Sequence, residues 1–462
     1  MEQRRYQVLG TAWLAWFVNY LDRTKTAALL PLIIVSLGMT TQQAGWVLFA
    51  FFLGYAAVQP FAGFVTDLVG PKKTLALSVA AFSIFTWTMA LVGSWEELLA
   101  RNVLFGISQG FEVTAGSRLV ATWFPRETRG RAFAVHQTAY TIAPVIVPFV
   151  AVPLAQSLGS WRWSFLIIAF FGLPVLAAID HFIHDRPERS RRVSEAELVK
   201  IFGRAEAQRE GRVLDPTKAH SKEELPPGER ITPYREIFLN RSIPLMFCAG
   251  FFSLLAIWGL TSWLPTYGVQ QLKLPLLAAG TLASAAWGGQ FFGVALGGYL
   301  SDKVFGTKRT PIWLLGGIGM ALAVLWAATF QRGIPLWQAL FAFFLAGFCA
   351  SWSPVGQLFA PYLAELLTPG AVGRSLGVVV LGGMIGSAVA QPLTAALIIQ
   401  TPSGPQYWPA FFMFAACGII SSLCVSGMIE PRVRRSYLMY LLSGKKEGSW
   451  KPYQQVAEPT VS

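Results

Sequence analysis

The chain has 462 residues, of which 54% are hydrophobic and only 13% are charged, with a formal net charge of +13. Ordinary soluble domains have about 25% charged residues, so this composition excludes a soluble enzyme and is typical of a membrane protein. Apolar stretches of the length needed to cross a bilayer recur along the whole chain.

Twelve membrane-spanning helices are predicted from these apolar stretches. In chain order they cover residues 8–37, 43–65, 74–93, 97–122, 131–156, 162–182, 243–268, 275–300, 311–330, 336–363, 374–399 and 407–429. The one long polar segment lies between the sixth and seventh spans. Its composition is that of a linker, with one amphipathic helix expected at about 194–210.

The predicted organisation is therefore all-α, with two six-helix bundles that repeat each other. We expect a first bundle at 1–182, a cytoplasmic linker at 183–240, a second bundle at 241–430 and a cytoplasmic tail at 431–462. The excess cations support this topology, because they fall in alternate short connections. They are Arg4, Arg5, Lys72, Lys73, Arg126, Arg129, Arg131, Lys303, Lys308, Arg309, Arg432, Arg434 and Arg435. By the positive-inside rule both termini are cytoplasmic, and the basic balance gives no reason to expect nucleic acid.

Two similar turns mark equivalent places in the two halves. GFVTDLVGPKK follows the second span and GYLSDKVFGTKR follows the eighth. Each turn pairs a carboxylate at a helix end with cations, and its glycines permit close helix approach. We expect conformational gating from Gly63, Asp67, Gly70, Lys72, Gly298, Asp302, Gly306 and Arg309. Parallel repeats with a substrate site between them are typical of a rocking transporter.

The first span is interrupted by Asp22, Arg23 and Lys25. An ionised side chain at bilayer depth costs about 3 kcal/mol or more, so such groups usually face a water-filled path and carry function. A guanidinium suits a carboxylate or sulfonate because its rigid fork binds two oxygens. A structural Asp22–Arg23 ion pair is the alternative, and Glu112 could likewise pair structurally with Arg118 or Lys25.

Few ionisable side chains occur in the spans of the second half, which are instead rich in aromatic residues. Trp258, Trp263, Trp287, Trp352 and Gln357 are expected to enclose the body of the substrate. These tryptophans favour an aromatic or otherwise apolar substrate body.

The paired turns, the six-plus-six helices and the central cytoplasmic loop resemble the major facilitator superfamily over essentially the whole chain. Several strings further resemble the anion:cation symporter family, whose members carry organic anions such as sugar acids and aromatic carboxylates. These strings are NYLDR (19–23), GYAAVQPFAGFVTD (54–67), RLVATWFPRETRGRA (118–132), SWRWSFLI (160–167) and WLPTYGVQQLKL (263–274).

The resemblance implies roles for individual residues. Arg23 corresponds to the arginine that contacts the substrate anion, Asp22 to a protonation site and Tyr55 to a cavity-lining tyrosine. The family's coupling glutamate in helix 4 is replaced here by Gln109, and Glu112 lies one turn further on, on the same face. Either Glu112 has taken over the proton role or coupling rests on Asp22 alone. We also expect Gln109, Tyr140, Trp352 and Gln357 to contact the substrate.

The predicted function is import of a small organic anion by proton symport and alternating access. We expect a monomer in a cell membrane, with a bacterial inner membrane implied by the resemblance, and no cofactor or metal. Export of a drug or metabolite is the first alternative, although the fifth span lacks the glycine-rich signature of proton antiporters. A non-transporting membrane receptor is the second. No nucleophile–base pair or metal cluster occurs at a spacing that would indicate an enzyme.

Overall fold

The structure is a computed structural model that describes residues 4–190, 193, 195–202, 234–305, 309–352, 362–363, 366–367, 369–402 and 404–428. Two of the predicted site residues, Gly306 and Gln357, lie outside the described residues, as does the predicted tail at 431–462. The described part is almost entirely helical, with one short β-hairpin.

The first half is built from eight helices. They are α1 (Arg4–Leu37), α2 (Thr41–Val69), α3 (Pro71–Met89), α4 (Trp95–Gln109), α5 (Glu112–Trp123), α6 (Arg126–Ser157), α7 (Trp161–Phe170) and α8 (Gly172–Phe182). Two predicted spans are thus divided. The span at 97–122 breaks at Gly110, whose carbonyl oxygen accepts a hydrogen bond from the Gln59 side chain at 3.2 Å. The span at 162–182 breaks before Pro174, which lacks the N–H that would bond to Phe170.

Short elements follow the first half. A 3₁₀ turn at Pro187–Arg189 and α9 (Glu195–Phe202) come next, and α11 (Tyr234–Leu239) precedes the second half. Helix α9 falls inside the range predicted for an amphipathic helix. The Glu197 carboxylate accepts a hydrogen bond from the backbone N–H of Arg5 at 3.0 Å, and this bond connects α9 to the start of α1.

The second half contains the remaining long helices. They are α12 (Ser242–Gln270), α13 (Leu276–Tyr299) with a π-helical extension (Leu300–Val304), α14 (Thr310–Ala328), α15 (Leu336–Ala350), α17 (Pro369–Leu397) and α18 (Trp408–Ser426). The strands β1 (Ile399–Thr401) and β2 (Gly404–Gln406) form an antiparallel hairpin between α17 and α18, with Ile399 opposite Gln406.

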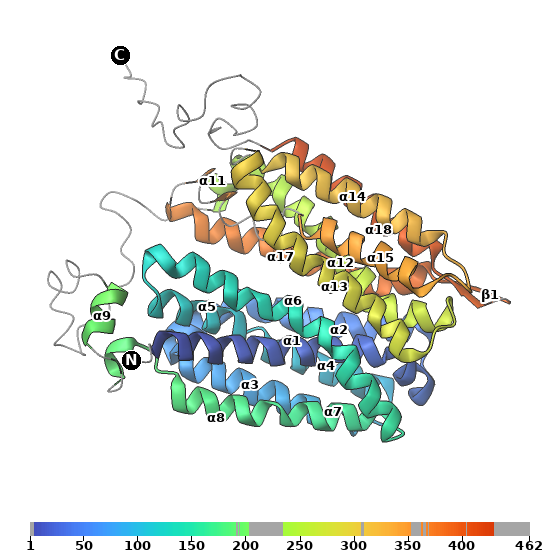
Figure 1. Ribbon diagram of the computed structural model, residues 1–462, viewed down its shortest axis with the longest axis horizontal. Coiled ribbons are helices and arrows are strands. Elements are labelled where there is room, and N and C mark those ends of the chain that lie inside the picture. Colours follow the sequence, from blue (N-terminus) through green and yellow to red (C-terminus); the bar gives the residue numbers. More distant parts are fainter. Residues whose placement is uncertain are drawn as a thin grey trace, which may run out of the picture.

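Figure 1 shows two helical bundles, one from each half of the chain, lying side by side with their long helices roughly parallel. Within the described residues, seven helical segments are long and apolar enough to cross a membrane by length and composition, and α15 is a shorter apolar helix. Helix α1 is 34 residues long but contains the charged triplet that lowers its hydropathy. The break at Gly110 divides the fourth predicted span into two short helices.

Among the described residues, the two halves meet mainly where α2 packs on α17, α6 on α13, and α1 on α12. We call the end at which α1 begins the N-end and the end with the hairpin the far end (Figure 1). Close contacts between halves lie toward the far end. A Cβ on Gly45 would lie 2.8 Å from the Cβ of Ala395, and one on Gly280 would lie 2.8 Å from the Cβ of Pro148.

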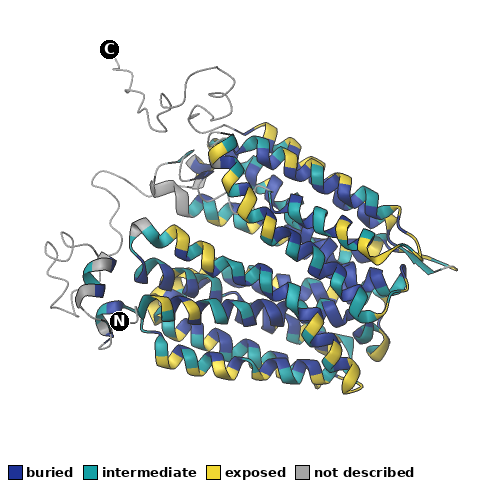
Figure 2. Cartoon of the chain, viewed as in Figure 1, coloured by how far each residue is buried: buried dark blue, intermediate teal, exposed yellow. Residues whose placement is uncertain are grey.

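Toward the N-end the same helices become exposed. On α2, Phe61, Phe64 and Leu68 are 62–74% exposed. On α13 every residue from 276 to 290 is at least partly covered, whereas Phe292 and Tyr299 are exposed. Figure 2 shows exposed positions on α6 and α13 where they approach the N-end. The bundles are therefore packed together at the far end and separated at the N-end.

Candidate substrate-binding site

A cavity of about 610 Å³, including its open mouth, lies between the two halves. It is lined by Arg23, Thr24, Thr26, Ala27, Ala28, Leu48, Phe51, Phe52, Asn102, Phe105, Pro144, Val147, Pro148, Trp258, Thr261, Ser262, Pro265, Ala283 and Trp287. Both bundles contribute to its wall, and Arg23 is the one charged side chain in this lining.

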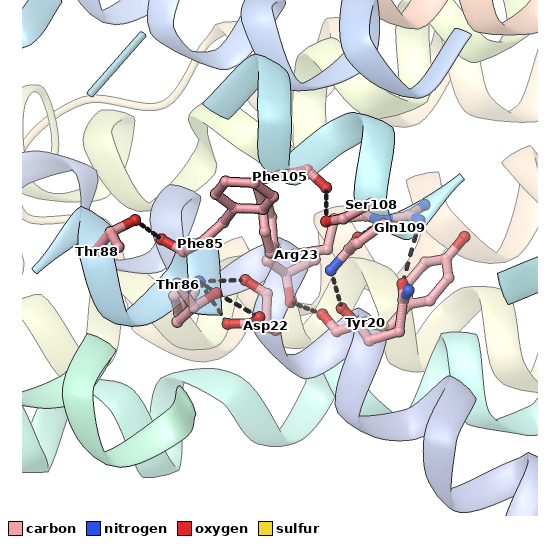
Figure 3. Close-up of polar contacts among 12 residues, drawn as sticks. Tyr20, Asp22, Arg23, Phe85, Thr86, Thr88, Phe105, Ser108 and Gln109 are labelled. Carbon is pink, nitrogen blue, oxygen red and sulfur yellow. Dashed lines mark hydrogen bonds and ion pairs between the residues drawn. The ribbon is translucent and has the colours of Figure 1, made fainter. Parts of the chain in front are cut away.

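The Arg23 guanidinium is held by two amides and surrounded by aromatic rings. Its Nε donates to Oε1 of Gln109 at 3.1 Å (Figure 3), and Nη2 donates to Oδ1 of Asn19 at 3.2 Å. Its central carbon lies 4.3 Å from the ring centre of Tyr20 and 4.7 Å from that of Tyr55. Among the described residues no carboxylate lies within ion-pair distance of Arg23. Three of its five N–H groups therefore make no hydrogen bond to the described residues.

Asn19 joins Arg23 to Glu112. The Asn19 side-chain oxygen accepts from Arg23, and its Nδ2 donates to Oε2 of Glu112. Gln109 also donates to the backbone oxygen of Asn19, at 3.1 Å. Glu112 is 1% exposed, and its second oxygen, Oε1, makes no hydrogen bond to the described residues. A buried carboxylate is thus connected to the cavity through one amide.

Sequence reasoning missed Asn19, although a signal for it was present. It lies four residues before Arg23 on α1, so the two side chains share one face of the helix. A polar amide one turn from an intramembrane arginine is a natural hydrogen-bond partner for it. The expected structural pairing of Glu112 with Arg118 or Lys25 is not found, because Arg118 lies 3.7 Å from Asp67 and Lys25 is paired with Asp22.

Asp22 is engaged on another side of α1. Its Oδ1 lies 2.5 Å from the Lys25 ammonium, and its Oδ2 accepts from the Thr86 hydroxyl at 2.5 Å (Figure 3). The ammonium also lies over the rings of Phe105 and Phe165 at 4.8 and 4.4 Å. Neither Asp22 nor Lys25 belongs to the cavity lining. The alternative of an Asp22–Arg23 ion pair is therefore wrong, because Lys25 is the cation that faces the carboxylate.

Two other residues predicted to contact the substrate, Tyr140 and Trp352, do not line the cavity. Tyr140 packs against Tyr20, with ring centres 5.6 Å apart. The indole of Trp352 donates to the Gly293 carbonyl oxygen at 2.7 Å and lies outside the cavity lining. Of the remaining tryptophans expected there, Trp258 and Trp287 line the cavity, whereas Trp263 is buried outside its lining.

The first predicted gating turn forms a polar cluster at the N-end. Gly70 has a φ of +95° and connects α2 directly to α3. A Cβ there would lie 3.0 Å from the Asp185 carboxylate, which accepts from the Lys72 backbone N–H at 2.8 Å. The Lys72 ammonium lies 3.1 Å from Asp180. A glycine is therefore suited to position 70, because the backbone there has a positive φ and because a carboxylate lies where a Cβ would be.

The second gating turn is described in part. Arg309 is buried, and its Nη1 donates to the Ser301 hydroxyl at 3.1 Å. Asp302 lies in the π-helical extension of α13. A Cβ on Gly298 would meet no atom within 4 Å, and the same holds for Gly63 in the first half.

Comparison with known proteins agrees with this architecture. The chain is 29% identical to a probable sulfoacetate transporter of Cupriavidus necator over 67% of the chain and 68% of that protein. It is 23% identical to a hexuronate transporter of Bacillus subtilis, over 91% and 93% of the two chains. The crystal structure of a D-xylose–proton symporter superposes with a TM-score of 0.70 at 15% identity, covering 92% and 98%, which shows the fold.

A family model described as the Major Facilitator Superfamily matches residues 12–353. The predicted all-α membrane fold with two six-helix bundles is confirmed by this match and by the superposition. The chain is therefore a multi-pass membrane transporter, not an enzyme, and it belongs to the Major Facilitator Superfamily.

Proposed function

We propose that the protein is a secondary active transporter that imports a small organic anion together with protons by alternating access. The observation that carries this proposal is Arg23: a guanidinium that faces a cavity between the halves and has no carboxylate partner among the described residues. The names of the two relatives, a sulfoacetate and a hexuronate transporter, support an organic anion as the cargo.

Arg23 is suited to bind the anionic group of the substrate. Its side chain is 9% exposed, so the positive charge has lost most of its water. A buried charge without a counter-charge is costly, and a carboxylate or sulfonate in the cavity would supply the missing partner. The amides of Gln109 and Asn19 fix the orientation of the fork, which leaves its free N–H groups to bind two oxygens of the substrate. Tyr55 and Tyr140 would complete the surroundings of the bound anion.

Glu112 is our candidate for the coupled proton. It lies one amide away from Arg23, so an anion bound to the guanidinium would be close to a second negative charge. Protonation of Glu112 removes that repulsion, which means that proton and substrate favour each other's binding. The sequence also suggested Asp22 for this role. Because Lys25 already supplies a counter-charge to Asp22, we assign the proton to Glu112.

The arrangement of the two bundles supports alternating access. They are in contact at the far end and separated at the N-end, as in one of the two states that a rocking transporter visits. We propose that the N-end faces the cytoplasm of a bacterial cell, in line with the cations near it, and that the protein acts as a monomer. The turns at Asp67 and Asp302 would then gate the cytoplasmic side.

Uptake into proteoliposomes tests this function. Purified protein is reconstituted, an inward proton gradient is imposed, and a panel of sugar acids, aromatic carboxylates and sulfonates is offered. Accumulation that disappears when the gradient is collapsed is the expected result, and Arg23→Ala should abolish it. Failure of every anion to accumulate, with folded protein in the vesicles, contradicts the proposal and would favour export or a receptor role.

A further inference from the structure

We infer that the substrate is a monoanion with a flat, largely apolar body, such as an aromatic carboxylate or sulfonate, rather than a polyhydroxylated sugar acid. This inference rests on the proposed function, because it concerns the same cavity beside Arg23. Three properties of the cavity wall support it: its charge, the state of its hydroxyl groups and the placement of its aromatic rings.

The wall offers one positive charge. Arg23 is the sole charged residue in the described part of the lining, and the nearby ammonium of Lys25 is already paired with Asp22 at 2.5 Å. A second anionic group on the substrate would enter the cavity without a counter-charge in the described lining, which is costly where water is excluded. One anionic group is therefore what the cavity neutralises.

Three polar side chains of the wall already donate a hydrogen bond to a backbone carbonyl. The Thr24 hydroxyl donates to the Tyr20 carbonyl and the Thr261 hydroxyl to the Ile257 carbonyl, each at 2.8 Å. The Asn102 amide donates to the Val47 carbonyl at 3.1 Å. Within the described lining the buried Thr26 hydroxyl has no hydrogen-bond partner. A sugar acid would exchange many hydrogen bonds to water for few in the cavity.

Aromatic rings cover the side of the cavity beyond the guanidinium. Trp258 and Trp287 lie with ring centres 5.3 Å apart, and Phe52 lies 5.1 Å from Trp258. Phe51, another wall residue, lies 5.1 Å from Phe52, and its ring centre is 5.0 Å from the central carbon of Arg23. A continuous aromatic surface therefore begins at the cation. Such a surface suits a substrate whose anionic end meets Arg23 while its ring packs against the tryptophans.

Calorimetric binding to the purified full-length protein tests the inference directly. Benzoate, benzenesulfonate, gluconate and the dianion phthalate are compared at one pH. We expect benzoate or benzenesulfonate to bind at least about tenfold more tightly than gluconate or phthalate, which corresponds to about 1.4 kcal/mol. The two aromatic monoanions also distinguish a carboxylate from a sulfonate cargo.

Gluconate or phthalate binding as tightly as the aromatic monoanions overturns the inference. If gluconate also accumulates in proteoliposomes under a proton gradient, the proposed function stands and the inferred substrate class alone is wrong. If none of the four anions binds or accumulates, the proposed function fails as well.

Variants of the wall provide the second test. Trp258→Ala should weaken benzoate binding by about tenfold, whereas Trp258→Phe should retain most of it, because an aromatic face is kept. Trp337→Ala is the matched control, since that tryptophan is 69% exposed and lies outside the cavity lining.

Discussion

The ammonium of Lys25 lies 2.5 Å from the carboxylate of Asp22, and both side chains are shut off from solvent inside the first bundle. Lys25 lies three positions after Asp22 on α1, so one turn of helix carries an ion pair on one side and Arg23 in the cavity wall. Charged residues that are adjacent in the sequence thus lie in two different environments, a buried ion pair and the cavity wall.

The first prediction concerns this ion pair. Removing one partner, as in Asp22→Asn or Lys25→Met, leaves an uncompensated buried charge and should lower stability by about 3–5 kcal/mol. The double variant Asp22→Leu/Lys25→Met should recover much of that loss. Thermal unfolding of the purified proteins in detergent measures the effect.

Transport by the double variant decides where the proton binds. If Glu112 carries it, folded Asp22→Leu/Lys25→Met protein keeps gradient-driven uptake. Loss of coupling with retained exchange would instead return the proton role to Asp22, as the resemblance to the anion:cation symporter family implied.

The second prediction concerns the shape of the cation at position 23. Arg23→Lys keeps the charge but loses the planar fork, so substrate affinity should fall roughly tenfold to a hundredfold. Binding by calorimetry measures it, and Arg101→Lys serves as the control because Arg101 pairs with Glu97 on α4, outside the cavity lining. Equal affinity in Arg23→Lys and the wild type would mean that the fork does not hold the anion.

The third prediction separates coupling from translocation. Glu112→Gln keeps the size of the side chain next to Asn19 but cannot exchange a proton. We expect gradient-driven accumulation to fall by about tenfold or more while counterflow exchange remains near the wild-type rate. Equal losses in the two assays would assign Glu112 a purely structural role.

The fourth prediction addresses the contact between the bundles at the far end. A side chain at Gly280 would collide with Pro148 of the other half, so Gly280→Val should disfavour the state in which the far end is closed. Accessibility of a cysteine at Ala395, which is 5% exposed and lies against Gly45 of the other half, should rise.

Gly288→Val is the matched control for this prediction. It lies on the same helix, and a Cβ there would meet no atom within 4 Å. Similar labelling of the Gly280→Val and Gly288→Val proteins would show that the Gly280–Pro148 contact does not hold the far end closed.

The sequence determined the class and organisation of this protein. The spans could be predicted because crossing hydrocarbon requires about twenty apolar residues in a helix. Those residues are consecutive in the sequence, so no knowledge of the tertiary structure is needed to find them. The breaks at Gly110 and Phe171 were missed, since hydropathy does not record where one side-chain hydrogen bond or one proline interrupts a helix. The two similar turns after the second and eighth predicted spans could be found in the sequence because each motif is contiguous.

Only the tertiary structure decided how the charged residues are used. Arg23 points to a different side of α1 from Asp22 and Lys25. Which side faces the cavity depends on how α1 packs against α3, α6 and α12. The Asn19 link to Glu112 and the placement of Trp258 beside Trp287 likewise join residues far apart in sequence. Helical periodicity fixes the face that each residue occupies, but packing between helices fixes what that face meets.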